Sequence, residues 1–197
     1  VSGYDPLTAN QQIDWNKVRS KLINLNAILE GGVVHKPLEL VGYHLNRFAE
    51  ILSRAIFVYI ERDLMDVAYS IAQARKRNNK DIKSWWGSYP PVGVYERLKG
   101  ESYAVQIIEQ ILFFKEMYNS QLSNLAPVRL VKTSYDEICN DPIGLLRGVQ
   151  KCALQVGCEI SVYDPPRKFD VGEKQKDQSI CDSLRDAFEV VAPHFLK

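Results

Sequence analysis

The stretch FVYIERDLMDVAYS, residues 57–70, predicts a buried strand that passes directly into a helix. The apolar and β-branched run of residues 55–60 is typical of a parallel strand covered on both faces. Asp63 is a favourable N-cap for the helix that follows, and Asp66 lies in the first turn of that helix. A buried strand followed at once by a capped helix indicates an α/β fold.

Further strands and helices alternate on both sides of this junction. Short strands are expected at residues 33–35 and 128–131, and helices at residues 12–30, 38–53, 101–123, 142–156 and 179–192. Residues 84–94 hold two Trp, a Tyr, two Pro and two Gly, which predicts an aromatic loop. The alternation predicts a three-layer fold, a parallel sheet with helices on both faces. Because no polar linker interrupts the chain, residues 1–197 are expected to form a single domain.

Charge and cysteine content narrow the class of protein. The chain has 197 residues, with 25 Lys and Arg against 24 Asp and Glu, so its net charge of +1 does not favour a nucleic-acid or membrane partner. No apolar run approaches the ~20 residues of a membrane span. None of the four cysteines has CxxC spacing, so zinc is not expected, and free, reduced cysteines indicate a cytoplasmic protein.

Polar and cationic residues follow each expected strand, at the edge where parallel sheets bind ligands. Arg62 lies at the start of a helix, where free N–H groups and a guanidinium suit bidentate phosphate binding. Ser70 follows eight residues later. In the alternative interpretation, Arg62 pairs with Asp63 or Asp66, and Ser70 has no role beyond its place on the helix.

This stretch resembles the 3′-phosphate-binding motif of the sulfotransferase family, in which a strand ends in R-D-P-x-D-V and a serine follows eight residues after the arginine. Residues 62–67 match that pattern except at Leu64, which replaces the proline, and Ser70 is in register. Residues 131–142 are similar to the family's strand followed by Y-E-D-L-x-x-D-P. Residues 33–37, VVHKP, are similar to the strand that ends in the catalytic histidine. The three motifs occur in the family's order.

The resemblance implies a P-loop-kinase-like fold and transfer of a sulfuryl group from 3′-phosphoadenosine 5′-phosphosulfate (PAPS) to a hydroxyl or amine, without a metal. Arg62 and Ser70 would hold the 3′-phosphate. Arg167 is a further candidate ligand, since the segment that it begins is similar to the family's R-K-G-x-x-G loop. His35 would take the acceptor's proton, and Lys36 would stabilise developing charge. In the alternative interpretation, His35 hydrogen-bonds backbone at a strand end.

The acceptor, a small molecule or a glycan, would contact the aromatic loop. Trp85, Trp86 and Tyr89 are expected to line its pocket, or else to cap the core beneath the loop. The cations between residues 75 and 83 are expected to form a solvated helix end rather than a steering patch.

One family motif, the P-x-S-G-T-T loop for the 5′-phosphosulfate, does not occur in this sequence. We expect that an N-terminal strand and this loop precede Val1, or that the protein is a remnant without them. Two other functions stay open: a P-loop-fold nucleotide or metabolite kinase, although no GxxxxGK motif is present, and a non-catalytic nucleotide- or protein-binding domain.

Overall fold

The computed structural model describes residues 12–29, 33–36, 40–162, 164–169 and 175–195. The chain divides into two compact units. We call the first the sheet unit, Thr8–Arg62 with Gln121–Gly172, and the second the helical unit, Val1–Leu7 with Asp63–Ser120 and Glu173–Lys197. Each unit is described by itself, and the expected single domain stays a prediction.

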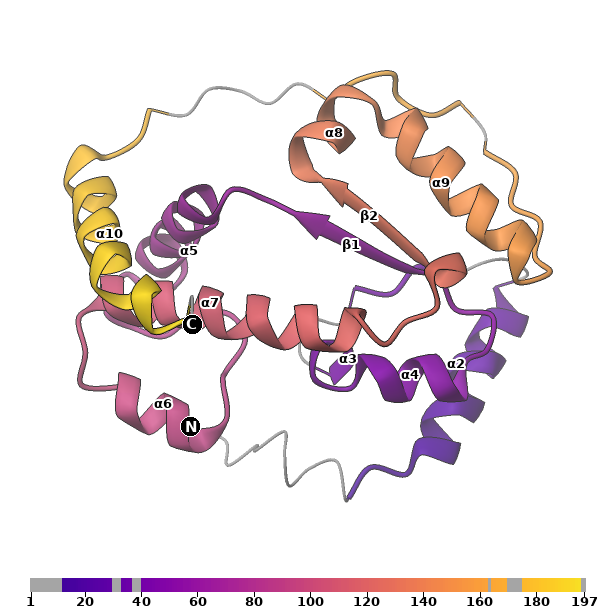
Figure 1. The fold of residues 1–197 in the computed structure, drawn as a ribbon, viewed down its shortest axis with the longest axis horizontal. Coiled ribbons are helices and arrows are strands. Elements are labelled where there is room, and N and C mark those ends of the chain that lie inside the picture. Colours follow the sequence, from indigo (N-terminus) through magenta and orange to yellow (C-terminus); the bar gives the residue numbers. More distant parts are fainter. Residues whose placement is uncertain (1–11, 30–32, 37–39, 163, 170–174, 196–197) are drawn as a thin grey trace. The chain divides into compact units, whose positions relative to one another are not determined.

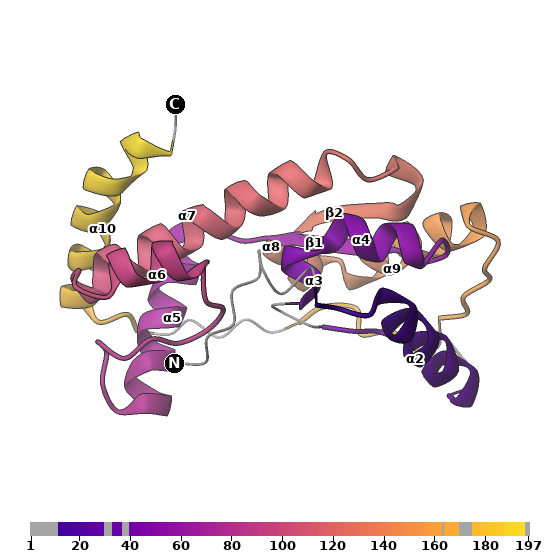
Figure 2. The ribbon, with the colours of Figure 1, turned by 90° about the horizontal axis from the view of Figure 1, so that it is seen from below.

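The described part of the sheet unit contains a pair of parallel strands and six helical segments. The strands are β1 (Phe57–Glu61) and β2 (Leu130–Ser134), and the helical segments are α2 (Trp15–Ile28), α3 (Leu40–Tyr43), α4 (Leu45–Ile51), η1 (Pro127–Arg129), α8 (Tyr135–Asn140) and α9 (Pro142–Gln155). Phe57 lies opposite Leu130 and Glu61 opposite Ser134, so both strands end at the same edge (Figure 1). Helices α8 and α9 pack on β2, and α2 packs on α4 (Figure 2).

Capping residues explain where α8 and α9 begin, and a glycine explains how closely α9 packs on β2. The Ser134 hydroxyl accepts from the Glu137 backbone N–H, and the Glu137 carboxylate accepts from the Ser134 N–H, which is a capping box at the start of α8. Asp141 caps α9 through the Gly144 N–H, with Pro142 at the first helical position. A Cβ at Gly148 would lie 3.2 Å from Cγ1 of Val131, so the missing side chain permits α9 to pack closely on the strand.

Arg129, at the start of β2, fixes the end of α4. Its guanidinium donates to the backbone carbonyls of Ala49, Leu52 and Ala55 at 2.8, 2.6 and 2.9 Å, and lies over the Phe57 ring at 5.5 Å. Carbonyls at a helix C-terminus lack intrahelical donors and favour a cation. Arg129 therefore ties α4, the start of β1 and the start of β2 together.

The helical unit is built on helices alone among its described residues. These are α5 (Leu64–Asn79), α6 (Val92–Leu98), α7 (Tyr103–Leu122, of which the last two residues belong to the sheet unit), α10 (Gln178–Val191) and η2 (Ala192–His194). Its core contains Ala68, Ala72, Ala104, Ile107, Ile108, Leu112, Ile180, Leu184, Ala187, Val191 and Ala192. The small side chains of Ala68 and Ala72, both fully buried, permit close packing of α10 on α5.

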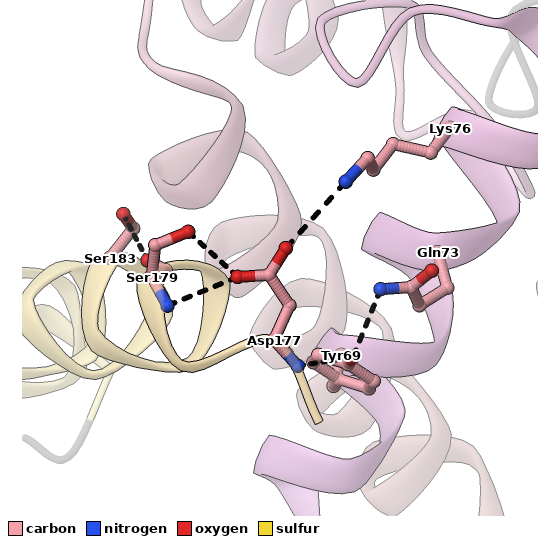
Figure 3. Close-up of polar contacts among 6 residues, drawn as sticks. All are labelled: Tyr69, Gln73, Lys76, Asp177, Ser179 and Ser183. Atoms are coloured by element: carbon pink, nitrogen blue, oxygen red, sulfur yellow. Dashed lines mark hydrogen bonds and ion pairs between the residues drawn. The ribbon is translucent and has the colours of Figure 1, made fainter. Parts of the chain in front are cut away.

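Polar contacts hold the N-terminus of α10 on α5 (Figure 3). The Asp177 carboxylate caps α10 by accepting from the Ser179 N–H, and it pairs with Lys76 at 3.6 Å. The Asp177 backbone N–H donates to the Tyr69 hydroxyl at 2.7 Å, and Gln73 donates to the same hydroxyl at 3.0 Å. The Ser179 hydroxyl also donates to this carboxylate at 2.7 Å, and that hydrogen bond first, with Lys76 adding to it, lowers the pKa of Asp177.

The structure confirms an α/β fold that is mostly helical, with a small parallel sheet. The strand at residues 55–60 is confirmed as β1, but the expected cover on both faces is wrong, because Val58 and Ile60 are 42% and 49% exposed. The apolar run reports strand propensity and does not reveal whether a layer covers it. The expected strand 128–131 is displaced to β2, because Pro127 starts a 3₁₀ turn over its first residues.

Other elements differ from expectation. Residues 33–36 have no regular secondary structure and Val34 is 95% exposed, so the expected strand 33–35 is wrong, and its valines find no partner strand. The aromatic loop ends at Pro91, which is the N-cap of α6 (Val92–Leu98). Proline is favoured at the start of a helix, which explains why the proline-rich loop leads into one. Between residues 40 and 51, one expected helix is two, α3 and α4, which meet at His44.

We expect Arg129→Met to destabilise the sheet unit by about 3 kcal/mol, because three carbonyls lose a charged donor while the aliphatic packing is kept. Urea unfolding followed by circular dichroism measures this change. Arg147→Met, an exposed arginine on α9, is the matched control and should change the free energy of unfolding by less than about 0.5 kcal/mol. Equal stability of the two variants would contradict the role given to Arg129.

Candidate functional site

The end of the parallel strand pair carries an unpaired cation. Because Glu61 and Ser134 are register partners at the ends of β1 and β2, the residues that directly follow the strands, Arg62 and Tyr135, also meet. The Arg62 guanidinium lies over the Tyr135 ring, 4.4 Å from its centre, which is a cation–π contact. Arg62 is exposed and forms no ion pair with any residue that the structure describes. Its N–H groups are therefore available to an anion from solvent.

The two carboxylates that the sequence offers as partners of Arg62 have partners within the helical unit. Asp63 is the N-cap of α5 and accepts from the Asp66 N–H at 2.9 Å. Asp66 pairs with Lys176 at 2.5 Å, and this contact raises the pKa of Lys176. The capping role predicted for Asp63 is confirmed, and so is the place of Asp66 in the first turn.

The polar residues at the end of β2 are used by the helix that follows. Glu137 accepts from the Thr133 hydroxyl at 3.1 Å as well as from the Ser134 N–H, and these bonds, the backbone one first, lower the pKa of Glu137. Glu137 therefore occupies these donors of β2, and they are not available to an anion from solvent. Among the residues of this edge that the structure describes, Arg62 is a cation without an acidic partner, so it suits an anion.

The side chains of the other residues expected at the donor and catalytic sites form no hydrogen bond with any residue that the structure describes. Ser70 is on an exposed position of α5, in the helical unit, so its pairing with Arg62 stays a prediction. His35 and Lys36 are exposed in the irregular segment 33–36. Arg167 is exposed, but its segment is anchored, because the Phe169 N–H donates to the Cys139 carbonyl at the end of α8.

The aromatic loop forms a cluster in the helical unit. Trp85 stacks on Tyr89 with ring centres 5.6 Å apart, and both contact Tyr95 of α6 at 5.2 Å. Gln110 of α7 holds the loop by donating to the carbonyls of Trp86 and Ser88. Trp85 and Tyr89 thus pack on one another, but Tyr89 is 36% and Trp86 38% exposed, so only Trp85 fits the core-capping alternative. Tyr95 was not foreseen, because it lies beyond the expected loop.

Beneath this cluster lies a buried arginine. Arg75 has no exposed surface, and its guanidinium lies 5.2 Å from the centre of the Trp85 ring. One nitrogen, Nη1, donates to Gln106 Oε1 at 2.9 Å, whereas Nε and Nη2 have no hydrogen-bond partner among the described residues. Burial lowers the pKa of Arg75 to about 10, partly opposed by Asp81, Tyr89 and Tyr95.

For Arg75, the expected solvated helix end is wrong. The sequence carries a signal that identifies it: Arg75 follows the buried Ala68 and Ala72 at spacings of seven and three, so it continues their stripe into the core. Lys76, Arg77, Lys80 and Lys83 are exposed, as expected.

Comparisons with known proteins do not identify the chain: no family model, curated protein or solved structure matches it. Within the described ranges, no three His, Cys, Asp or Glu side chains are grouped to hold a metal ion. No helix in the same ranges has the length and apolar character needed to cross a membrane. The four cysteines, all described, form no disulfide.

We expect Arg75→Met to raise the free energy of unfolding by about 1–3 kcal/mol, because methionine fills similar space without burying an unpaired charge. Arg75→Ala should instead lower it by about 2–5 kcal/mol through the cavity that it leaves. Urea unfolding of both variants tests the pair of expectations. A destabilising Arg75→Met would contradict the first expectation and would show that the Gln106 and Trp85 contacts outweigh the cost of the buried charge.

Proposed function

We propose that the protein is a sulfotransferase that uses PAPS as donor and a hydroxyl or amine as acceptor. The observation that supports this best is Arg62: its exposed guanidinium has no acidic partner among the described residues and is positioned by the Tyr135 ring at the end of two parallel strands. An arginine fixed by stacking keeps its N–H fork preorganised for a phosphate, with little side-chain entropy left to lose.

In this proposal, the donor's 3′-phosphate binds to Arg62 and to the Ser70 hydroxyl, with Arg167 as a further ligand. Asp63 caps α5 through its side chain, and Arg62 directly precedes that cap. The two-stranded sheet would belong to the three-layer, P-loop-kinase-like sheet that the motif order implies. Since no P-x-S-G-T-T sequence occurs in the 197 residues, contacts to the 5′-phosphosulfate are not assigned.

The proposed reaction is an in-line displacement at sulfur. The acceptor oxygen or nitrogen forms the new bond to sulfur, the bond from sulfur to the bridging phosphate oxygen breaks, and 3′-phosphoadenosine 5′-phosphate leaves. His35 takes the acceptor's proton, and Lys36 stabilises the charge that develops on the leaving phosphate. Trp85, Trp86 and Tyr89 contribute to the acceptor pocket, with Trp86 the most accessible of the two indoles.

Calorimetric titration with 3′-phosphoadenosine 5′-phosphate tests the donor site. We expect wild-type protein to bind this nucleotide. Arg62→Ala should weaken binding by about 1.5–3 kcal/mol, because a charge-assisted pair is lost, and Ser70→Ala by about 1 kcal/mol. Arg147→Ala, another exposed arginine of the sheet unit, is the matched control and should bind like wild type. Absence of binding to wild type, or equal affinity of Arg62→Ala, would contradict the assignment.

Turnover tests the role of His35. With radiolabelled PAPS and a panel of phenol, sugar and amine acceptors, His35→Ala should lose the ~10²–10⁴-fold typical of a positioned general base and also lose the acidic limb of the pH–rate profile. Nucleotide affinity should stay unchanged, since the imidazole faces the acceptor. Lys36→Ala should lower turnover while keeping that limb. Near wild-type turnover of His35→Ala would show that His35 is not the base.

A further inference from the structure

An open groove lies in the sheet unit, and none of its lining residues takes part in the proposed reaction. It has a volume of about 650 Å³ and is lined by Trp15 of α2, by residues of α3 and α4 and their junction, and by Gln121. Its lining residues are Trp15, Tyr43, His44, Asn46, Arg47, Glu50 and Gln121. The lining combines hydrogen-bonding side chains with one large aromatic ring, which suits a polar ligand that can also pack on that ring.

Two buried polar atoms of this lining have no partner among the described residues. His44 is only 6% exposed, and its Nε2 forms no hydrogen bond. Asn46 Oδ1 is also buried and without a partner. Leaving such an atom unsatisfied is costly, and native structures seldom tolerate it without a reason. Both belong to side chains that line one groove, so a rotation of either side chain toward the groove would let a ligand supply the missing partner.

The walls of the groove are held in place. Gln121 donates through Nε2 to the Gly42 carbonyl at 2.7 Å and accepts at Oε1 from the Leu45 N–H at 2.9 Å, so its amide clamps the chain on both sides of His44. The Trp15 ring packs edge-on against His44 and Phe48, with ring centres 5.3 and 5.5 Å apart. Side chains fixed in this way preorganise a binding site.

The charges at the groove cancel. Arg47 and Glu50 form an ion pair at 2.5 Å, and the Arg47 guanidinium lies 6.0 Å from the centre of the Trp15 ring. Burial lowers the pKa of His44, which favours the neutral imidazole. A neutral groove with paired charges at its rim disfavours both anions and cations, and it leaves hydrogen bonding and ring packing as the means of recognition.

We propose that this groove binds a neutral polyhydroxylated ring, such as a pyranose sugar unit. A hydroxyl both donates and accepts, so it satisfies a neutral imidazole nitrogen in either tautomer and an amide in either orientation. The C–H face of a pyranose ring packs on the Trp15 indole, and the Arg47–Glu50 pair at the rim binds neighbouring hydroxyls. The inference does not depend on sulfuryl transfer, since none of its residues belongs to the proposed reaction.

The test uses NMR spectra of ¹⁵N-labelled protein, in which Trp15→Phe identifies the Trp15 indole signal. The probes are the methyl pyranosides of glucose, galactose, mannose and N-acetylglucosamine; cyclohexanol and sodium sulfate serve as counter-probes. We expect at least one pyranoside to shift the Trp15 signal with a dissociation constant on the order of 1 mM or below. Cyclohexanol, with one hydroxyl, and sulfate, with its charge, should bind at least ten-fold more weakly.

Variants of the groove connect this binding to its polar atoms. Asn46→Leu and His44→Phe should each weaken the pyranoside about five- to ten-fold, because each removes one hydrogen bond. Arg47→Met, a change at an exposed position that leaves the interior intact, should weaken it about three-fold or more. Asn24→Leu, at an exposed position of α2 outside the groove, is the matched control and should bind like wild type.

Each outcome decides the proposal. Pyranoside binding that falls in the groove variants and not in Asn24→Leu supports it. Binding of none of the four pyranosides overturns it, and so does binding that the groove variants leave unchanged. Tighter binding of sulfate would identify an anion site instead, and equal binding of cyclohexanol would identify a site for apolar rings. If Asn46→Leu or His44→Phe does not fold, Arg47→Met carries the comparison.

Discussion

The parallel pairing of β1 and β2 is the constraint on which the sheet unit depends. Its register sets Glu61 opposite Ser134, and the residues that follow, Arg62 and Tyr135, are brought into contact by it. A shift of one residue would reverse the side to which each side chain points and would separate the guanidinium from the ring. Arg129 fixes this register from the other end of β2, because its guanidinium binds the carbonyls around the end of α4 and the start of β1.

The helical unit depends instead on the close packing of α5 and α10. Ala68 and Ala72 leave no room for a larger side chain on that face, and Asp177 joins the two helices through Tyr69 and Lys76. Arg75 continues the same face and is drawn into the interior with it. The aromatic loop covers this guanidinium, so Trp85 packs on the core. Trp85 therefore has less freedom to line an acceptor pocket than a loop residue without such a contact would have.

The sheet unit thus has two candidate binding sites that favour ligands of different charge. At the end of β1, an exposed arginine without an acidic partner favours an anion. In the groove beside α2 and α4, paired charges and a neutral imidazole favour an uncharged ligand. The proposed sulfotransferase activity depends on the first, and the proposed binding of a polyhydroxylated ring depends on the second. Neither assignment requires the other, since the two sets of residues do not overlap.

The sequence by itself determined the elements whose signals are local. The run at residues 55–60, the Asp63 cap and the Asp141–Pro142 helix start predicted β1, α5 and α9, because strand propensity, capping and proline at a first helical turn act over a few residues. The spacing of apolar residues predicted α2, α7 and α10 in the same way, over the length of a whole helix. The sequence also placed a cation at the end of β1, which is where the structure has Arg62.

Only the tertiary structure decided which side chains have partners. That residues 33–35 form no strand, that Val58 and Ile60 are exposed, and that Arg75 is buried while Lys76 is not all depend on neighbours distant in sequence. The groove also depends on residues distant in sequence. In the sequence, His44 is one more polar residue of an expected helix, and nothing near it indicates that Trp15 and Gln121 will enclose it. Burial and hydrogen-bond satisfaction are properties of packed surfaces, so a local pattern cannot determine them.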